Sequence, residues 1–409
     1  MESFVKDQLI ATLKFAPFHW AASYFKKNAS PETEEAKRKV GGFMKGICHP
    51  GDNYAQITGA GIEWNRMDIA FPFDTGGNIR QEYLNWKEEA RRYQANGVRV
   101  MAVTPYPRTF IEYGVDPRLP ENEDRVREIA VFLLEDLRGL VEVYQITNEM
   151  GLPQFMKPLT TREAVRFIGI QLAAMHPRKG DVLLGYNSSG PQADLHSLMR
   201  PWHKYCDYVG IDIYLGCFVA AGNWMYMFEA LMRYLWSLTG KPILLAEFGY
   251  ISGGAPKTQE ERRAVLQRYG VASEQEAREK LGLFMKNLEA AEPKLHGRAT
   301  NLASGNPADL LFNTMERNHF YSEMPKGVVI KKYPHTPEGQ ADFYRDIFPL
   351  LAKLPFALGA FIYCWRDKER CGYCGQADCP QETRWGLVDP ECREKPSYYA
   401  VRDALAGIQ

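Results

Sequence analysis

Short runs of apolar residues alternate with longer amphipathic segments along most of this chain. Eight of the runs have the length and the polar or Gly/Pro-rich ends that are typical of β-strands. They begin at residues 41, 61, 97, 140, 181, 207, 241 and 359. Between most of them lie segments with helical periodicity, such as NIRQEYLNWKEEARRYQANG and NEDRVREIAVFLLEDLRG. The pattern therefore predicts strands and helices in alternation.

Such alternation is typical of parallel sheets, and eight repeats of it predict an α/β fold, the (β/α)8 or TIM barrel. The first helical unit, between His49 and Gly61, is short for this fold. A doubly wound open sheet is the alternative architecture, but no GxGxxG turn follows the first strand to support it.

Two parts of the chain depart from the regular alternation. Residues 1–40 predict an N-terminal helical extension, and residues 41–409 predict one barrel domain. More than a hundred residues separate the seventh strand from the eighth, so we expect 251–333 to be an insertion in the seventh βα loop. The barrel helix then resumes near TPEGQADFYRDIFPLLAKL. Because active sites of such barrels lie at the face that carries these loops, we expect the insertion to shape a pocket.

Two of the predicted strands end in a glutamate. Glu149 ends the fourth strand in YQITNEMG, and Glu247 ends the seventh in ILLAEFGY. In a closed eight-stranded ring these strands face each other across the mouth, so the two side chains can meet. A pair of carboxyl groups about 5 Å apart suits glycoside hydrolysis with retention. A single glutamate at a strand end is more often a turn cap or an ion-pair partner, but two together favour catalysis.

These residues, with their neighbours, resemble a known group of enzymes. The Asn-Glu pair on strand four and the Glu on strand seven are similar to the clan of retaining (β/α)8 glycoside hydrolases that holds β-galactosidases, cellulases and β-mannanases. The similarity extends to Arg66 in WNRMD, Tyr214 in GIDIYLG and Trp365 in FIYCWRD, and to the C-terminal RWGLVDPECREKPSYYAVRDAL. It covers most of 41–405 in strand order, whereas 251–333 matches nothing in these enzymes.

The resemblance implies a role for each of these side chains. Glu149 is the expected acid/base and Glu247 the expected nucleophile, which should be surrounded by hydrogen-bond donors because it must be ionised. By the same resemblance, Arg66, Asn148, Tyr214 and Trp365 are expected at the substrate or beside the nucleophile. His49 and Asn187, which end the first and fifth predicted strands, are further candidates from their positions alone. Arg66 could instead form an interior ion pair, Tyr214 and Trp365 could be core residues, and His49 could be structural.

Four cysteines lie close together in a segment that we expect to be a Cys-rich loop over 366–395. They are Cys371, Cys374, Cys379 and Cys392. Four thiolates fit a tetrahedral Zn²⁺ site, which would be structural because it leaves no open position for water. Free thiols or disulfides are the alternatives. The resembling glycosidases need no metal, so no cofactor is expected for catalysis.

Composition narrows the class of protein without choosing a substrate. Fifty basic residues balance fifty acidic ones, which argues against nucleic acid or an anionic membrane as a partner. No stretch approaches the roughly eighteen apolar residues of a membrane span. The N-terminus lacks the pattern of a signal peptide, so a cytoplasmic protein is the default expectation. The oligomeric state is open.

The expectation is therefore a retaining β-glycosidase that acts on a carbohydrate substrate. The long insertion favours a partly closed pocket, and hence exo action on short glycans. A catalytically silent carbohydrate-binding barrel and a metal-dependent hydrolase on the same fold are the alternatives. The latter requires His and Asp ligands at strand ends, and the sequence has no HxH pair there.

Overall fold

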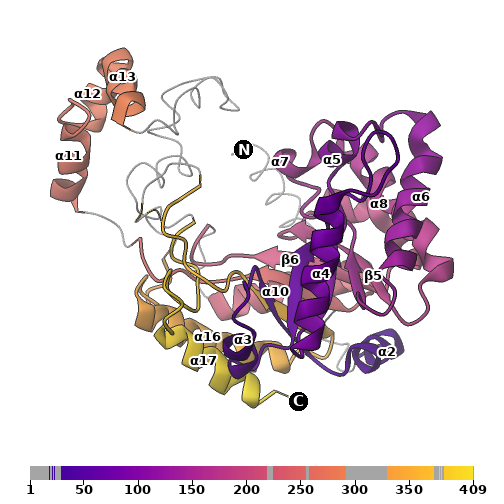
Figure 1. The fold of residues 1–409 in the computed structure, drawn as a ribbon. Coiled ribbons are helices and arrows are strands. Elements are labelled where there is room, and N and C mark those ends of the chain that lie inside the picture. Colours follow the sequence, from indigo (N-terminus) through magenta and orange to yellow (C-terminus); the bar gives the residue numbers. More distant parts are fainter. Residues whose placement is uncertain are drawn as a thin grey trace.

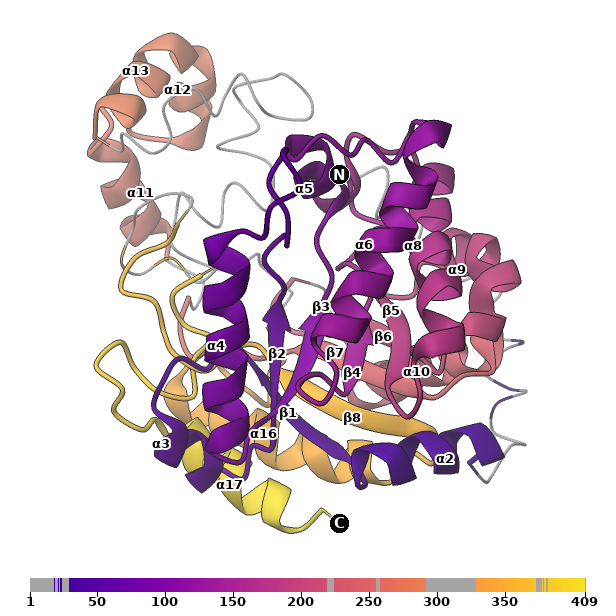
Figure 2. The same ribbon diagram turned by 45° about the vertical axis from the view of Figure 1, so that its right-hand side comes forward.

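The computed structural model describes residues 29–218, 224–254, 258–291, 329–372, 377, 379 and 382–408, with Phe18, Ala21 and Ser23. Within this part of the chain, eight parallel strands close into a barrel in sequence order, and β8 pairs with β1 (Figures 1 and 2). The strands are β1 Met44–Cys48, β2 Trp64–Asp68, β3 Arg99–Val103, β4 Val143–Gln145, β5 Leu183–Ser189, β6 Tyr208–Ile213, β7 Ile243–Phe248 and β8 Ala357–Ile362. All eight predicted strands and the TIM-barrel class are confirmed.

Helices surround the barrel in the described residues. They are α2 Pro31–Val40, α3 Tyr54–Gly59, α4 Gln81–Ala95, α5 Pro107–Glu112, α6 Glu123–Asp136, α7 Pro153–Met156, α8 Thr161–Met175, α9 Ala193–Met199, α10 Trp224–Thr239, α16 Pro337–Ala352 and α17 Pro396–Ala406. The unit after β1 is indeed short, because α3 has six residues. None of the helices in the described part of the chain combines the length and apolarity that crossing a membrane requires.

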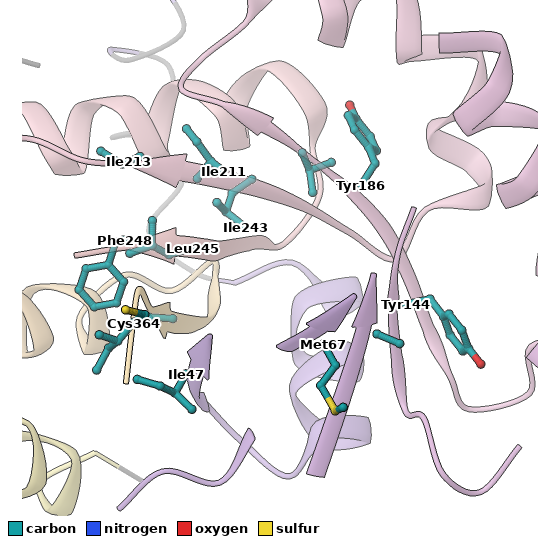
Figure 3. Close-up of a cluster of buried hydrophobic side chains, with 14 of the residues drawn as sticks. Ile47, Met67, Tyr144, Tyr186, Ile211, Ile213, Ile243, Leu245, Phe248 and Cys364 are labelled. Atoms are coloured by element: carbon teal, nitrogen blue, oxygen red, sulfur yellow. The ribbon is translucent and has the colours of Figure 1, made fainter. Parts of the chain in front are cut away.

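The apolar core has two layers, one inside the barrel and one between the barrel and its helices. Because side chains alternate along a strand, every second residue points outward into the helical layer; Figure 3 shows Ile47, Ile211 and Phe248 among those that do. The interior layer includes Met44, Trp64, Met101, Val143, Leu183, Tyr208, Leu244 and Phe361. The amino-terminal part of the barrel is thus filled with apolar side chains.

Glycines make room for the largest of these interior rings. A Cβ on Gly46 of β1 would lie 2.2 Å from a ring carbon of Phe361, and one on Gly185 of β5 would lie 2.6 Å from the ring of Tyr208. Such contacts are far inside the van der Waals distance. A small residue on one strand therefore complements a large one on a neighbouring strand.

Two additions flank the barrel. Helix α2 begins after the N-cap Ser30 and packs Ala36 and Val40 into the interior layer at its amino-terminal end (Figure 2). Between β7 and α16 the chain forms α11 Gln259–Gln267, α12 Glu274–Glu279 and α13 Leu281–Ala291, which stand apart from the ring of helices (Figure 1). These three helices lie in the predicted insertion, whose residues 255–257 and 292–328 are outside the described ones. Residues 1–17 of the predicted N-terminal extension are outside them as well.

Candidate active site

Arg66, near the carboxyl end of β2, connects three strands at the carboxyl-terminal end of the barrel. Its Nη1 donates to Oε1 of Glu247 at 2.7 Å, and its Nη2 donates to Oδ1 of Asn148 at 2.8 Å. Its Nε donates to Oε1 of Gln145 at 3.2 Å. The guanidinium is buried. One planar cation therefore holds a carboxylate of β7 beside the amide that follows β4.

Glu247 receives a second donor from the residue that directly follows β6. The hydroxyl of Tyr214 donates to its Oε2 at 2.7 Å, so each carboxylate oxygen accepts one hydrogen bond. Burial, and after it the charge of Glu247, raises the pKa of Tyr214 well above its usual value, so the phenol stays a donor. The Glu247 side chain keeps 12% of its surface exposed. This carboxylate is stabilised as an anion and remains open to a reacting partner.

The backbone after β4 turns sharply to present Asn148 and Glu149. Thr147 and Glu149 have φ angles of 57° and 47°, a left-handed region that residues other than glycine seldom adopt. The backbone N–H of Glu149 donates to Oδ1 of Asn187 at 2.9 Å, which holds this conformation. Gly151 follows because a Cβ there would lie 1.8 Å from the Oε1 of buried Gln192. The sequence NEMG therefore encodes a tight turn that aims a carboxyl group into the mouth.

The Asn148 amide is oriented by its neighbours. Its Oδ1 accepts from Arg66, from Nδ2 of Asn187 at 2.6 Å and from Nε2 of Gln145 at 3.2 Å. Three donors on one atom identify it as the oxygen, so Nδ2 must be the group that faces elsewhere. It lies within hydrogen-bond reach of the hydroxyl of half-buried Tyr106. Asn148 thus presents an N–H donor at the mouth.

The surroundings of Glu149 favour its protonated form. Burial, and then the negative charge of Glu247, raises its pKa to about 8, against the opposing effects of Ser189, Arg66 and Asp212. The side chain is 8% exposed. The mouth of the barrel therefore holds a carboxylic acid on one side and, on the other, a carboxylate fixed by two donors.

The other predicted site residues have mixed outcomes. Asn187, on β5, lies inside the network because it contacts Asn148 and the backbone of Glu149. His49 is exposed after β1, and its ring meets the edge of Tyr363 at 5.9 Å. Trp365 is 1% exposed and packs edge-to-face on Tyr398 of α17. Its ring is covered by core residues, which agrees with the alternative that Trp365 is a core residue, and its contact with substrate stays a prediction.

Tyr363, two residues earlier, is the aromatic side chain that β8 contributes to the mouth. Its ring lies edge-to-face with Tyr214 at 6.1 Å and with Trp385 at 5.8 Å, and Glu247 is among the charges that raise its pKa. The sequence interpretation missed Tyr363, which directly follows the last residue of β8. It also did not place Gln145 or Trp385 in the site, and it considered Asp212 only as a possible metal ligand of the alternative hydrolase.

The described residues of the Cys-rich loop do not test the zinc prediction. Cys371 and Cys379 are buried in an apolar cluster with Leu266, Phe284 and Leu288 of the inserted helices. Cys392 is a half-buried free thiol, and Cys374 lies outside the described residues. Among the residues that are described, no three His, Cys, Asp or Glu side chains are placed to hold a metal ion. Structural zinc on these four cysteines stays a prediction, which elemental analysis of the purified protein tests.

Comparison with known proteins supports the fold. No family model matches the chain, and a search of curated proteins finds no match. Among solved structures, the chain is similar to a family 39 glycoside hydrolase from Bacteroides cellulosilyticus WH2, with 13% identity, a TM-score of 0.54 and coverage of 89% of this chain and 64% of that one. It is similar to the GH53 catalytic domain of Ignisphaera aggregans, with 17% identity, a TM-score of 0.54 and coverage of 89% and 96%.

A third similar structure is the β-D-glucuronidase of Dictyoglomus thermophilum, with 13% identity, a TM-score of 0.51 and coverage of 90% of this chain and 51% of that one. The chain therefore spans only about half to two thirds of the length of two of these three proteins. At such identities the likeness shows the fold alone, which is an eight-stranded parallel barrel. It agrees with the resemblance found in the sequence.

Proposed function

We propose that this chain is a retaining glycoside hydrolase that cleaves β-glycosidic bonds, with Glu149 as acid/base and Glu247 as nucleophile. The observation that carries the proposal is that two neighbouring carboxyl groups have contrasting surroundings. Glu247 accepts from Arg66 and Tyr214, whereas Glu149 is buried with a pKa raised to about 8. A division into one acid and one ionised carboxylate is what double displacement at a sugar requires.

The first step forms a covalent glycosyl-enzyme. A carboxylate oxygen of Glu247 attacks the anomeric carbon, and the bond from that carbon to the leaving oxygen breaks. The proton of Glu149 moves to the departing oxygen, so the alcohol leaves neutral. Arg66 and Tyr214 keep Glu247 in place while its charge is lost to the ester. Asn148 donates its free N–H to the neighbouring sugar hydroxyl, a bond that can strengthen in the transition state.

The second step reverses these roles. Glu149, now a carboxylate, removes a proton from water, and the water oxygen attacks the anomeric carbon on the face that the alcohol left. The ester bond to Glu247 breaks, and Glu247 is released as a carboxylate. Two inversions at one carbon give retention, and Glu149 regains the proton it started with.

We also propose exo action on short glycans. The support is the segment between β7 and α16, whose helices α11–α13 contact the loop after β8 through Cys371 and Cys379. A long connection of this kind beside the mouth of a barrel favours a pocket over an open cleft. Exo action predicts monosaccharide release from chain ends, whereas endo action would shorten long polymers from within. Chromatography of products from an oligosaccharide ladder distinguishes them.

The catalytic assignment is tested with Glu149→Ala and Glu247→Ala on a panel of nitrophenyl β-glycosides, with and without azide. Both variants should lose several orders of magnitude in kcat/KM. Azide should rescue Glu247→Ala with an inverted glycosyl azide and Glu149→Ala with a retained one. Glu63→Ala is the control, because Glu63 lies just before β2 at the other end of the barrel, where it pairs with Lys45. Near-parental activity in either test variant would exclude the mechanism.

A further inference from the structure

A third carboxyl group lies in the site, and the double-displacement mechanism gives it no role. Asp212 of β6 is 3% exposed, and its Cα is in register with Ser189 of β5 on one side and with Glu247 of β7 on the other. Its Oδ2 accepts from Nδ2 of Asn187 at 2.6 Å. Burying a charged carboxylate is costly unless partners compensate for the lost water. Its second carboxylate oxygen, Oδ1, therefore also needs a partner.

That second oxygen, Oδ1, receives no hydrogen bond from a conventional donor among the described residues. The Glu149 carboxyl nevertheless lies within hydrogen-bond reach of Asp212. Two carboxylates are both acceptors, so such a contact is a hydrogen bond only when one of the two carries a proton. The contact between Glu149 and Asp212 is therefore a hydrogen bond if one of the two groups is protonated, whereas two carboxylates would have no donor between them.

We propose, resting on the proposed function, that Asp212 is a positioning residue that shares one proton with Glu149. Asn187 organises the pair, because its Nδ2 donates to Asp212 while its Oδ1 accepts from the backbone N–H of Glu149. The hydroxyl of Ser189 lies within reach of the Glu149 carboxyl. Asp212 and Glu149 are therefore fixed relative to each other by one amide on the strand between them.

The charged and titratable groups around the pair are consistent with one shared proton. Arg66 of β2 is the cation, and Glu247 of β7 is the neighbouring anion. Desolvation raises the pKa values of Cys48 on β1 and of Tyr214, which follows β6, well above their usual values, so both are neutral. Burial, and then the charges of Glu247 and Glu149, also raises the pKa of Asp212. Three carboxylates beside a single guanidinium would leave two uncompensated negative charges, and one proton on the pair reduces these to one.

The shared proton also has a consequence for the second step. Before glycosylation the three carboxyl groups carry two negative charges and one proton. Afterwards Glu247 is an ester, while Glu149 and Asp212 are both ionised, so the charge of the cluster is unchanged. The charge of Asp212 then makes the Glu149 carboxylate a stronger base toward water. Asp212 thereby helps the group that must be an acid first and a base later.

The test is Asp212→Asn, which keeps an oxygen for Asn187 and places an N–H₂ donor where Oδ1 lies. This donor stabilises ionised Glu149, and one negative charge is lost, so Glu149 should give up its proton at lower pH. The alkaline limb of kcat/KM, measured from about pH 5 to about pH 10, should move down by about one unit or more. Deglycosylation should slow, which a larger burst of leaving group reports.

A second readout does not depend on activity. Infrared absorbance of protonated carboxyl groups should decline with rising pH in the parent, and should decline at lower pH in Asp212→Asn. The control is Asp207→Asn, at the amino end of the same strand, where Asp207 accepts from Lys179 at 2.6 Å; its titration should match the parent. Unchanged infrared titration in Asp212→Asn overturns the shared proton. An infrared shift in a chain that cleaves no glycoside would instead retain the pair and reject the proposed function.

Discussion

At the scale of single residues, the hydroxyl of Tyr214 is the simplest test of how Glu247 is held. Tyr214→Phe removes one of its two charge-assisted hydrogen bonds and leaves the ring contacts with Trp385 and Tyr363 in place. Such a bond contributes about 1.5–3 kcal/mol, which corresponds to a loss of roughly 10- to 150-fold in kcat/KM. The measurement is steady-state kinetics on the substrate found in the glycoside panel.

Tyr398→Phe is the matched control. Its hydroxyl donates to the backbone oxygen of Gln56 at 3.0 Å, at the contact between α17 and α3. We expect this variant to lose some thermal stability and to keep its kcat/KM. Equal kinetic losses in the two variants would mean that Tyr214 acts only through folding.

The raised pKa of Glu149 also predicts how stability depends on pH. In the unfolded chain a glutamate loses its proton near pH 4.5, whereas in the folded protein Glu149 keeps it until about pH 8. Unfolding between these values releases a proton, so the folded state becomes less stable as the pH rises through this window. Glu149→Gln stays neutral. Its free energy of unfolding relative to the parent should rise from about pH 5 to about pH 8 and then level off, with a total change on the order of 5 kcal/mol. Thermal unfolding of both proteins at a series of pH values measures the difference.

Glu163 provides a control of opposite sign. Hydrogen bonds from the backbone and side chain of Thr160 lower the pKa of this partly exposed glutamate, which forms the capping box of α8. Its carboxylate stabilises the fold above the unfolded pKa, and this contribution is lost as the pH falls. Glu163→Gln should therefore be less stable than the parent at neutral pH and approach it in acid. A Glu149→Gln curve of the same sign would contradict the raised pKa.

Residues at strand ends could be predicted from sequence because the barrel fixes where they go. Glu149, Glu247, Arg66 and Tyr214 each lie at or near the carboxyl end of a strand, and strand order alone brings them together. Trp365 could not be placed in this way. It comes three residues after β8 ends, where the period of two no longer holds, and its ring turns into the core beside α17.

At the scale of elements, the close packing of neighbouring strands predicts that replacing a glycine by alanine lowers the free energy of unfolding. Gly185→Ala would place a Cβ 2.6 Å from the ring of Tyr208, whose hydroxyl is already fixed by the backbone oxygen of Tyr144. Overpacking of this kind costs about 1–3 kcal/mol. Urea unfolding should show this loss, and Gly185→Ala combined with Tyr208→Leu should recover part of it.

Gly282→Ala is the control for the same chemical change. Gly282 lies in α13, and a Cβ there would have no neighbour within 4 Å. In a helix the change from glycine to alanine stabilises by up to about 1 kcal/mol. If both alanine variants behaved alike, the ring of Tyr208 would have room to move, and the two strands would not be complementary.

The elements with strong periodicity were predictable, and the irregular ones were not. Strands bounded by turn residues, and helices such as α4 and α16, follow from local patterns. The position of α11–α13 does not, because those helices pack on a separate small core that includes cysteines more than eighty residues further along. The sequence indicated the insertion by its length alone, and contacts between distant segments decide the rest.

At the scale of the whole molecule, the barrel has an apolar end and a polar end. Ala36 and Val40 of α2 meet Met44 and Leu358 in the interior layer, whereas the three carboxyl groups and Arg66 occupy the carboxyl-terminal layer. Most polar groups in that layer are hydrogen-bonded to one another, which reduces the cost of burying them. The interior thus divides into a part that stabilises the fold and a part that can carry chemistry, as in other barrels of this architecture.

This division predicts that stability and activity can be changed separately. Val40→Ala removes apolar volume from the apolar end of the barrel and should lower the free energy of unfolding by about 1–3 kcal/mol. It should leave kcat/KM within about twofold of the parent, because the transition state is stabilised by groups at the opposite end. Tyr214→Phe should do the reverse. Urea unfolding and steady-state kinetics on both variants decide the matter. A fall in kcat/KM for Val40→Ala as large as that for Tyr214→Phe would mean that packing at one end positions the carboxylates at the other.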